Sequence, residues 1–118
     1  MPNAILYHNP RCTKSRQALS YLHTTALEFE LKEYLKEGLS LSEVTDLLSS
    51  LDFPHAVQMI RPKEAEFAQA GLSKTSSSED ILEALVDYPK LLERPILLLG
   101  KKAAIGRPLA NIETLVNA

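Results

Sequence analysis

The chain has 118 residues, of which 45% are hydrophobic and 24% charged, and its formal net charge is −2. These values suit one globular domain with a single core and give no support to a nucleic-acid-binding protein, which would usually be basic. The longest apolar run, Pro95 to Leu99, is far too short to span a membrane. Cys12 is the only cysteine, so no internal disulfide can form, and the N-terminus lacks the pattern of a signal peptide. We therefore expect a cytoplasmic protein with neither nucleic-acid nor membrane partners.

The first forty residues predict a strand, a helix and a second strand. Ala4–Tyr7 is a short apolar run, and the stretch from Ser15 to about His23 carries apolar residues at helical spacing. Residues 27–31 alternate apolar and polar side chains, which is typical of a half-buried strand. The helix between these two strands makes a crossover long enough to predict that they pair in parallel. Residues 34–38 are expected to lead out into a loop.

The middle of the chain, from about residue 40 to 91, predicts four short helices. Ser40 and Glu43 have the spacing of a capping box, and an apolar stripe from Leu41 to Leu51 follows. The second helix is expected over residues 54–60 and the third over residues 64–70. The serines before Glu79 offer caps for the fourth helix, whose predicted buried residues are Ile81, Leu82, Leu85 and Val86.

The end of the chain predicts two strands and a closing helix. Ile96–Leu99 is an apolar run, and a short turn separates it from residues 103–105, so we expect an antiparallel hairpin. Residues 109–116 carry apolar side chains at helical spacing. The whole order is βαβ, four small helices, then ββα. It predicts a single α/β domain over residues 1–118 with a mixed four-stranded sheet of the thioredoxin/glutaredoxin-like kind and a helical insertion between its two halves.

The most informative stretch surrounds Cys12, where a strand gives way to a helix. Helix N-termini favour negative charge, and Arg11, Lys14 and Arg16 add full positive charges nearby. A thiol in this place should lose its proton easily. We therefore predict a reactive thiolate beside an anion site. The alternative is a buried and inert cysteine, since free cysteines often pack as small hydrophobic residues.

Three arginines, Arg61, Arg94 and Arg107, each directly precede a proline at the edge of a predicted element. Each one alone is most simply a surface cation. If they converge, their guanidinium groups could hold a tetrahedral oxyanion bidentately.

Three further residues near these motifs have open roles. From the frequency of cis bonds alone, Pro95 is expected to be trans. His8 could change the acidity of the thiol or pack at the strand end. Ser15 could be the helix N-cap, a hydrogen-bond donor to the thiolate, or both. The remaining histidines have no partners at ligand spacing, so no metal site is expected.

The stretch His8–Arg16 resembles the active-site loop of the glutaredoxin-linked arsenate reductases, the ArsC family. The similarity runs over nearly the whole chain. It includes Ile60-Arg61, Gly71-Leu72, Glu93-Arg94-Pro95-Ile96 and Gly106-Arg107-Pro108.

This resemblance implies a thioredoxin-like fold and a role for each motif residue. Cys12 would be the nucleophile that attacks arsenate, and His8 and Ser15 would help to keep it as the thiolate. Pro95 would be cis. No bound cofactor is implied, but glutathione would be a co-substrate and glutaredoxin a partner. The three arginines would bind the arsenate oxygens: Arg61, Arg94 and Arg107.

Other classes of function remain as alternatives. A glutathione-dependent monothiol oxidoreductase needs only one thiolate. Spx-like regulators that bind RNA polymerase resemble the chain in size, but they typically carry Cys-x-x-Cys where this chain has Ser15. A tyrosine-phosphatase-like loop needs arginine six positions after the cysteine, where this chain has Ala18.

Overall fold

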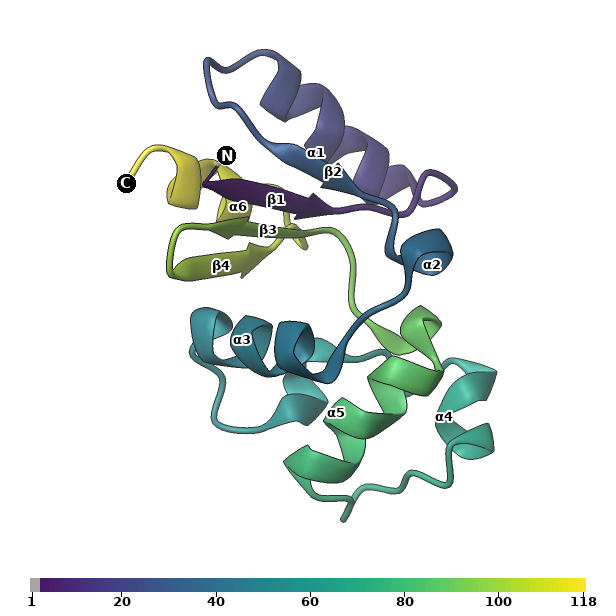
Figure 1. Ribbon diagram of the computed structural model, residues 1–118. Helices are drawn as coiled ribbons and strands as arrows, with labels where there is room; N and C mark the ends of the chain where they lie inside the picture. The colour runs from purple at the N-terminus through teal and green to yellow at the C-terminus, as the bar shows by residue number, and fades with distance from the viewer. Residues whose placement is uncertain (1–2) are drawn as a thin grey trace. The chain divides into compact units, whose positions relative to one another are not determined.

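The structure is a computed structural model that describes residues 3–118 of the chain. The described residues divide into two compact units (Figure 1). The first combines the residues up to Glu37 with Arg94–Ala118, and the second is Gly38–Glu93. We predicted a single domain over residues 1–118 with a helical insertion at about 40–91, and this stays a prediction. Residues 1 and 2 lie outside the described part of the chain.

The first unit is built on a four-stranded mixed sheet. Its strands are β1 (Ala4–Tyr7), β2 (Glu30–Lys32), β3 (Ile96–Leu99) and β4 (Lys102–Ile105), in the spatial order β2-β1-β3-β4. β1 pairs parallel with β2 and antiparallel with β3, and β3 pairs antiparallel with β4. The predicted α/β class, the mixed sheet and the closing hairpin are therefore confirmed.

Two helices, α1 (Thr13–His23) and α6 (Ala110–Val116), complete the core of this unit. Figure 1 shows both beside the sheet. Leu22 of α1 and Ile112 of α6 are fully buried with Leu6 and Leu97 of the central strands. Burying a leucine or isoleucine side chain stabilises a fold by about 1.5–3 kcal/mol. This packing anchors the loop that carries Cys12, since the loop joins β1 to α1.

Two predictions for the segment after α1 are wrong in detail. Residues 27–31 were expected to form a strand, but only Glu30–Lys32 join the ladder, where they pair with Ile5–Tyr7 of β1. Residues 34–38 were expected to form a loop, but Tyr34–Glu37 form a short helix, α2. Its first turn closes because the N–H groups of Lys36 and Glu37 donate to the carbonyl oxygen of Glu33. The fully buried ring of Tyr34 holds α2 in place.

The second unit is entirely helical in the regular elements that the structure describes. They are α3 (Leu41–Leu51), η1 (Ala56–Met59), α4 (Ala65–Gln69), α5 (Ser78–Asp87) and η2 (Pro89–Leu91). The predicted capping box is confirmed: the Glu43 N–H donates to Ser40 Oγ at 3.1 Å, and the Ser40 N–H donates to Glu43 Oε1 at 3.2 Å. This cap explains why α3 begins at Leu41, because it satisfies two backbone N–H groups of the first turn.

The apolar stripes of this unit are narrower than the sequence predicted. Leu41 is 48% exposed and Val86 38% exposed, although periodicity placed both on buried faces. Each lies at the margin of its helical stripe, where neighbouring elements and not periodicity decide burial. The predicted helix over residues 54–60 is only a turn of 3-10 helix, η1, between a proline turn and Ile60.

A short antiparallel bridge within the second unit positions the backbone of Arg61. Ile60 pairs with Leu92. The Arg61 N–H donates to the carbonyl oxygen of Leu91 at 2.8 Å, and the Glu93 N–H donates to that of Met59 at 2.9 Å. The bridge therefore sets Arg61 and Glu93 on two adjacent pieces of backbone.

Candidate active site

Cys12 is the N-cap residue of α1 and is partly exposed. Its N–H donates to the carbonyl oxygen of Asn9 at 3.0 Å, and its carbonyl oxygen accepts from the Arg16 N–H at 3.0 Å. The loop therefore holds the sulfur at the positive end of the helix, where a thiolate is stabilised.

Ser15 organises the inside of the same loop. Its Oγ lies 2.8 Å from His8 Nδ1 and accepts the Asn9 N–H at 2.9 Å, and all three residues are buried. Of the two roles that the sequence left open for Ser15, that of N-cap is excluded, because Cys12 is the N-cap and α1 begins at Thr13. The hydroxyl group instead forms hydrogen bonds that connect the first turn of α1 to the residues just after β1.

The surroundings of Cys12 lower the pKa of its thiol. Burial alone would raise the pKa, but the backbone N–H of Ser15, the guanidinium group of Arg94 and the backbone N–H of Lys14 together outweigh burial. Neither N–H has the geometry of a regular capping hydrogen bond, so both act mainly as oriented dipoles. A lowered pKa increases the thiolate fraction at neutral pH, which is the form that attacks an electrophile.

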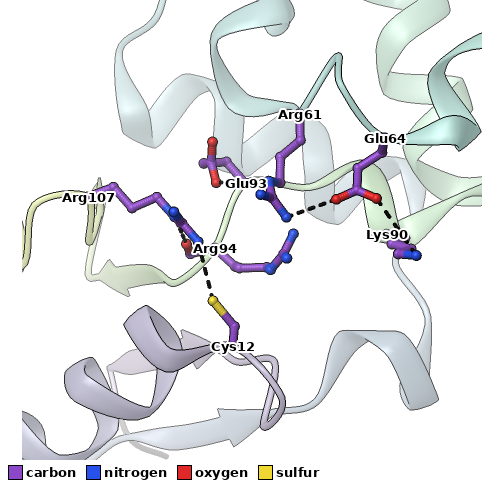
Figure 2. A network of polar contacts seen from close by, with 7 residues as sticks. All are labelled: Cys12, Arg61, Glu64, Lys90, Glu93, Arg94 and Arg107. Carbon is purple, nitrogen blue, oxygen red and sulfur yellow. Dashed lines mark hydrogen bonds and ion pairs between the residues drawn. The ribbon is translucent and has the colours of Figure 1, made fainter.

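Arg107 reaches the sulfur from the other end of the chain. Its Nη2 lies 3.3 Å from Cys12 Sγ, and its Nε donates to the carbonyl oxygen of Arg94 at 2.7 Å (Figure 2). One guanidinium group thus joins the sulfur to the backbone before β3. The Arg94 side chain also acts on the thiol, and its Nε and Nη1 are buried.

The backbone explains why Arg94 and Arg107 meet. β3 begins just after Arg94 and β4 ends just before Arg107, and Ile96 pairs with Ile105 across the hairpin. The Arg94–Pro95 peptide bond is cis, as the family resemblance implied, whereas the frequency of cis bonds favoured trans. The Arg107–Pro108 bond is also cis, which the sequence analysis did not anticipate.

Gly106 allows this close approach. A Cβ at Gly106 would lie 2.7 Å from Ile112 Cδ1 and 2.8 Å from Pro95 Cγ, both too short for an unrelaxed contact. The Gly106 N–H also donates to the carbonyl oxygen of Pro95 at 2.8 Å. Only glycine fits here without displacing a neighbour.

His8 is 2% exposed, and burial lowers the pKa of its imidazole, although the charge of Glu33 opposes this effect. It is therefore mostly neutral at pH 7, and it lies against the Ser15 hydroxyl. Apart from the effect of the Ser15 backbone N–H on the thiol pKa, the thiolate-stabilising role given to His8 and Ser15 by the resemblance stays a prediction.

Arg61 lies in the second unit, where acidic side chains hold its guanidinium group. Nη1 donates to Glu64 Oε1 at 2.9 Å, and Nε lies 3.6 Å from Glu93 Oε1. Lys90 Nζ lies 3.7 Å from Glu64 Oε2 (Figure 2). Neither carboxylate was expected from the sequence to pair with Arg61, although a glutamate three positions after an arginine in a turn is a signal for one of them. The role of Arg61 alongside Cys12 stays a prediction.

Residues 3–118 contain neither a cluster of metal-ligating side chains nor a helix that could span a membrane. No group of three or more histidine, cysteine, aspartate or glutamate side chains is arranged to hold a metal ion. Within the same range, no helix combines the length and apolar character needed to cross a membrane.

Comparisons with known proteins give consistent findings. The sequence profile of the ArsC family matches residues 7–115. An arsenate reductase of Neisseria meningitidis serogroup A is 43% identical over 117 residues, which covers 98% of this chain and 100% of that protein. An arsenate reductase of Haemophilus influenzae is 33% identical over 107 residues and covers 90% of this chain and 92% of its own length. The solved structure of an arsenate reductase from Vibrio cholerae superposes with a TM-score of 0.87 at 31% identity, covering 95% of this chain and 97% of that one.

Proposed function

Because the chain belongs to the ArsC family of thioredoxin-like proteins, we propose that it is an arsenate reductase that acts through a covalent adduct on Cys12. The observation that carries the proposal is the sulfur at the N-terminus of α1. There the thiol has a lowered pKa and lies 3.3 Å from the guanidinium group of Arg107. A thiolate beside guanidinium groups suits attack on a tetrahedral oxyanion.

The first step is substitution without reduction. The Cys12 thiolate attacks arsenic(V), a sulfur–arsenic bond forms, and one arsenic–oxygen bond breaks as a hydroxyl group takes a proton from solvent and leaves as water. Arg94 and Arg107 bind the remaining oxygens, and Arg61 is proposed as a third anion-binding group. Such donors are already in place when negative charge develops, and this preorganisation is often the largest part of catalysis.

The second half needs thiols from other molecules, because Cys12 is the only cysteine in the chain. Glutathione replaces a second oxygen as water and forms an arsenic–sulfur bond. A glutaredoxin thiolate then attacks the glutathione sulfur, and the electron pair of that arsenic–sulfur bond passes to arsenic. Arsenic(V) becomes arsenic(III) while two thiols become a mixed disulfide. Water finally releases arsenite and restores the Cys12 thiolate.

The test is coupled turnover with arsenate, glutathione, glutaredoxin, glutathione reductase and NADPH, followed as loss of NADPH absorbance. We expect turnover that requires arsenate and glutaredoxin and that falls sharply in Arg94→Ala. A protein that alkylates readily at Cys12 but shows no arsenate-dependent NADPH loss would contradict the proposal.

A second candidate, a glutathione-dependent monothiol oxidoreductase, is favoured by one observation. Cys12 is partly exposed and its thiol pKa is lowered, so a mixed disulfide could reach it without any arsenic. The same coupled assay separates the candidates: reduction of a glutathione mixed disulfide with no response to arsenate would favour the oxidoreductase.

A further inference from the structure

A groove lies beside the Cys12 loop within the first unit. It has a volume of about 220 Å³, and the loop forms one wall and the α2 segment the other. Figure 1 shows α2 next to the end of β1, where this loop begins. The lining residues are Asn9, Pro10, Arg11, Glu33, Leu35 and Lys36.

The wall on the loop side is held in shape by its own hydrogen bonds. The Arg11 N–H donates to Asn9 Oδ1 at 3.0 Å, and Arg16 Nη1 donates to the carbonyl oxygen of Pro10 at 3.0 Å. The groove is therefore preformed, and a ligand would not have to order this wall on binding.

The groove combines an apolar surface with charges of both signs. Pro10 is exposed, and Leu35 is 43% exposed although its neighbour Tyr34 is fully buried. Arg11 and Lys36 supply two cations and Glu33 one anion. Lys36 Nζ lies 3.9 Å from Glu33 Oε1, and the lysine side chain is 79% exposed, so this ion pair is weak and either partner can turn to a ligand.

We propose that this groove binds glutathione next to Cys12, an inference that rests on glutathione being the co-substrate in the proposed function. Glutathione carries two carboxylates and one ammonium group, which matches two cations and one carboxylate. Its carboxylates pair with Arg11 and Lys36, its ammonium group pairs with Glu33, and its apolar parts lie on Pro10 and Leu35. Because pockets that enclose a small molecule measure about 300–1,000 Å³, this groove holds only part of the tripeptide. The thiol is then left outside, and Arg11 directly precedes Cys12.

This assignment separates the two reactants of the proposed reaction. The guanidinium groups of Arg94 and Arg107 act on the sulfur and on the oxyanion that it attacks. The cations of the groove belong to other elements, the loop and α2, and bind the second reactant. The two reactants can therefore be present together, as a mixed arsenic adduct requires.

The test uses a reaction that needs no arsenate. The Cys12 thiolate attacks glutathione disulfide, one sulfur–sulfur bond forms as another breaks, and glutathione leaves as its thiolate. Mass spectrometry follows the rate at which Cys12 becomes glutathionylated. The comparison substrate is 2-hydroxyethyl disulfide, which is uncharged and has no carboxylates for the groove to bind.

We expect Lys36→Glu to slow glutathionylation about fivefold to tenfold and to change the rate with 2-hydroxyethyl disulfide less than about twofold. Arg11→Glu also reverses a charge next to Cys12, so it should slow both disulfides, but glutathione disulfide about fivefold to tenfold more. Lys101→Glu is the matched control, since Lys101 is an exposed lysine on the turn between β3 and β4. An equal slowing of both disulfides would mean that the substitutions act on the thiol itself. An equal effect of Lys101→Glu and Lys36→Glu would mean that only overall charge matters. Either result would overturn the proposal.

A binding measurement completes the design. S-methylglutathione is titrated into Cys12→Ser and followed by amide chemical shifts, which we expect to move at residues 9–11 and 33–36. Shifts confined to other parts of the first unit would overturn the groove assignment. If these shifts appear but arsenate turnover is absent, the groove stands and the arsenate reductase proposal fails. If arsenate turnover is normal and the groove variants leave the KM for glutathione unchanged, the groove fails and the reductase proposal stands.

Discussion

Arg107 and Arg61 are both held by hydrogen bonds, but Arg107 contacts the reactive sulfur whereas Arg61 contacts acidic side chains. Arg107 donates to the carbonyl oxygen of Arg94 and to the sulfur of Cys12. Arg61 is held by the carboxylates of Glu64 and Glu93. A carboxylate both orients a guanidinium group and cancels much of its charge. We infer that Arg107 is suited to stabilise negative charge, and that an anion at Arg61 must compete with acidic side chains already in place.

The largest effect is expected at Cys12, the residue that Arg107 contacts. Cys12→Ser should abolish arsenate turnover completely, because the hydroxyl group of serine is not ionised at neutral pH and cannot form the arsenic adduct. The fold should be intact, since the side chain is partly exposed and makes no capping hydrogen bond. NADPH-coupled turnover and thermal unfolding measure both properties. Substantial turnover in a folded variant would refute the role of Cys12.

The second prediction tests the paired contacts of Arg107. Arg107→Lys keeps the charge but loses the planar group that reaches the sulfur and the carbonyl oxygen together. We expect kcat for arsenate to fall by about 10²-fold, the usual cost of losing one preorganised donor to an oxyanion. Lys102→Arg, an exposed change on β4, is the control. Near-normal kcat in Arg107→Lys would show that a point charge is enough and that the paired contacts of the guanidinium group are not required.

The third prediction addresses the backbone that brings Arg94 and Arg107 together. Gly106→Ala would place a methyl group 2.7 Å from Ile112 and 2.8 Å from Pro95, so both side chains must shift. We expect the free energy of unfolding to fall by about 1–3 kcal/mol, as for other overpacked sites. Urea denaturation measures this change. Gly71→Ala is a useful contrast, because its cost would come from the positive φ of 73° and not from a steric clash.

The fourth prediction concerns the thiol pKa. The Arg94 guanidinium helps to hold the pKa of Cys12 below its ordinary value, so Arg94→Gln should raise it. The pH profile of iodoacetamide alkylation should then move to higher pH, and the rate at pH 7 should fall. Because the folded pKa is lowered, the thiolate contributes stability that is present above the unfolded pKa of about 8.5 and is lost as the pH falls through the folded value. An unchanged alkylation profile would exclude Arg94 as a cause.

The smallest effect on arsenate turnover is expected for a substitution at Glu64, in the second unit. Glu64→Gln keeps an oxygen acceptor for Arg61 Nη1 but removes the negative charge beside it. If Arg61 binds arsenate, the KM for arsenate should fall by about twofold to threefold with kcat unchanged, since surface ion pairs are worth about 0.2–1 kcal/mol. The same substitution in an Arg61→Ala background should change nothing, because the effect acts through Arg61. If Glu64→Gln changes the KM for arsenate equally in both backgrounds, its effect does not act through Arg61.

Local features were predictable from the sequence because they depend on neighbouring residues. The capping box between Ser40 and Glu43 and the strand–loop–helix corner around Cys12 both arise within a few residues. The role of Ser15 was only partly predictable. Its spacing from Cys12 suggested a cap or a donor to sulfur, yet its hydroxyl group contacts His8 and Asn9 instead, because the buried end of β1 lies within reach.

The sequence by itself determined the α/β class, most of the helices and strands, and the presence of a thiol at a helix N-terminus, since apolar periodicity, turns and helix caps depend on neighbouring residues. Tertiary structure decided which charges meet. Arg107 lies 95 positions after Cys12, and the pairing of β1 with β3, together with that of β3 with β4, brings its guanidinium group to the sulfur. In the same way, only the bridge between Ile60 and Leu92 sets Glu93 beside Arg61. Backbone pairing between distant segments is settled by the packing of the whole sheet or unit, so no window of neighbouring residues contains it.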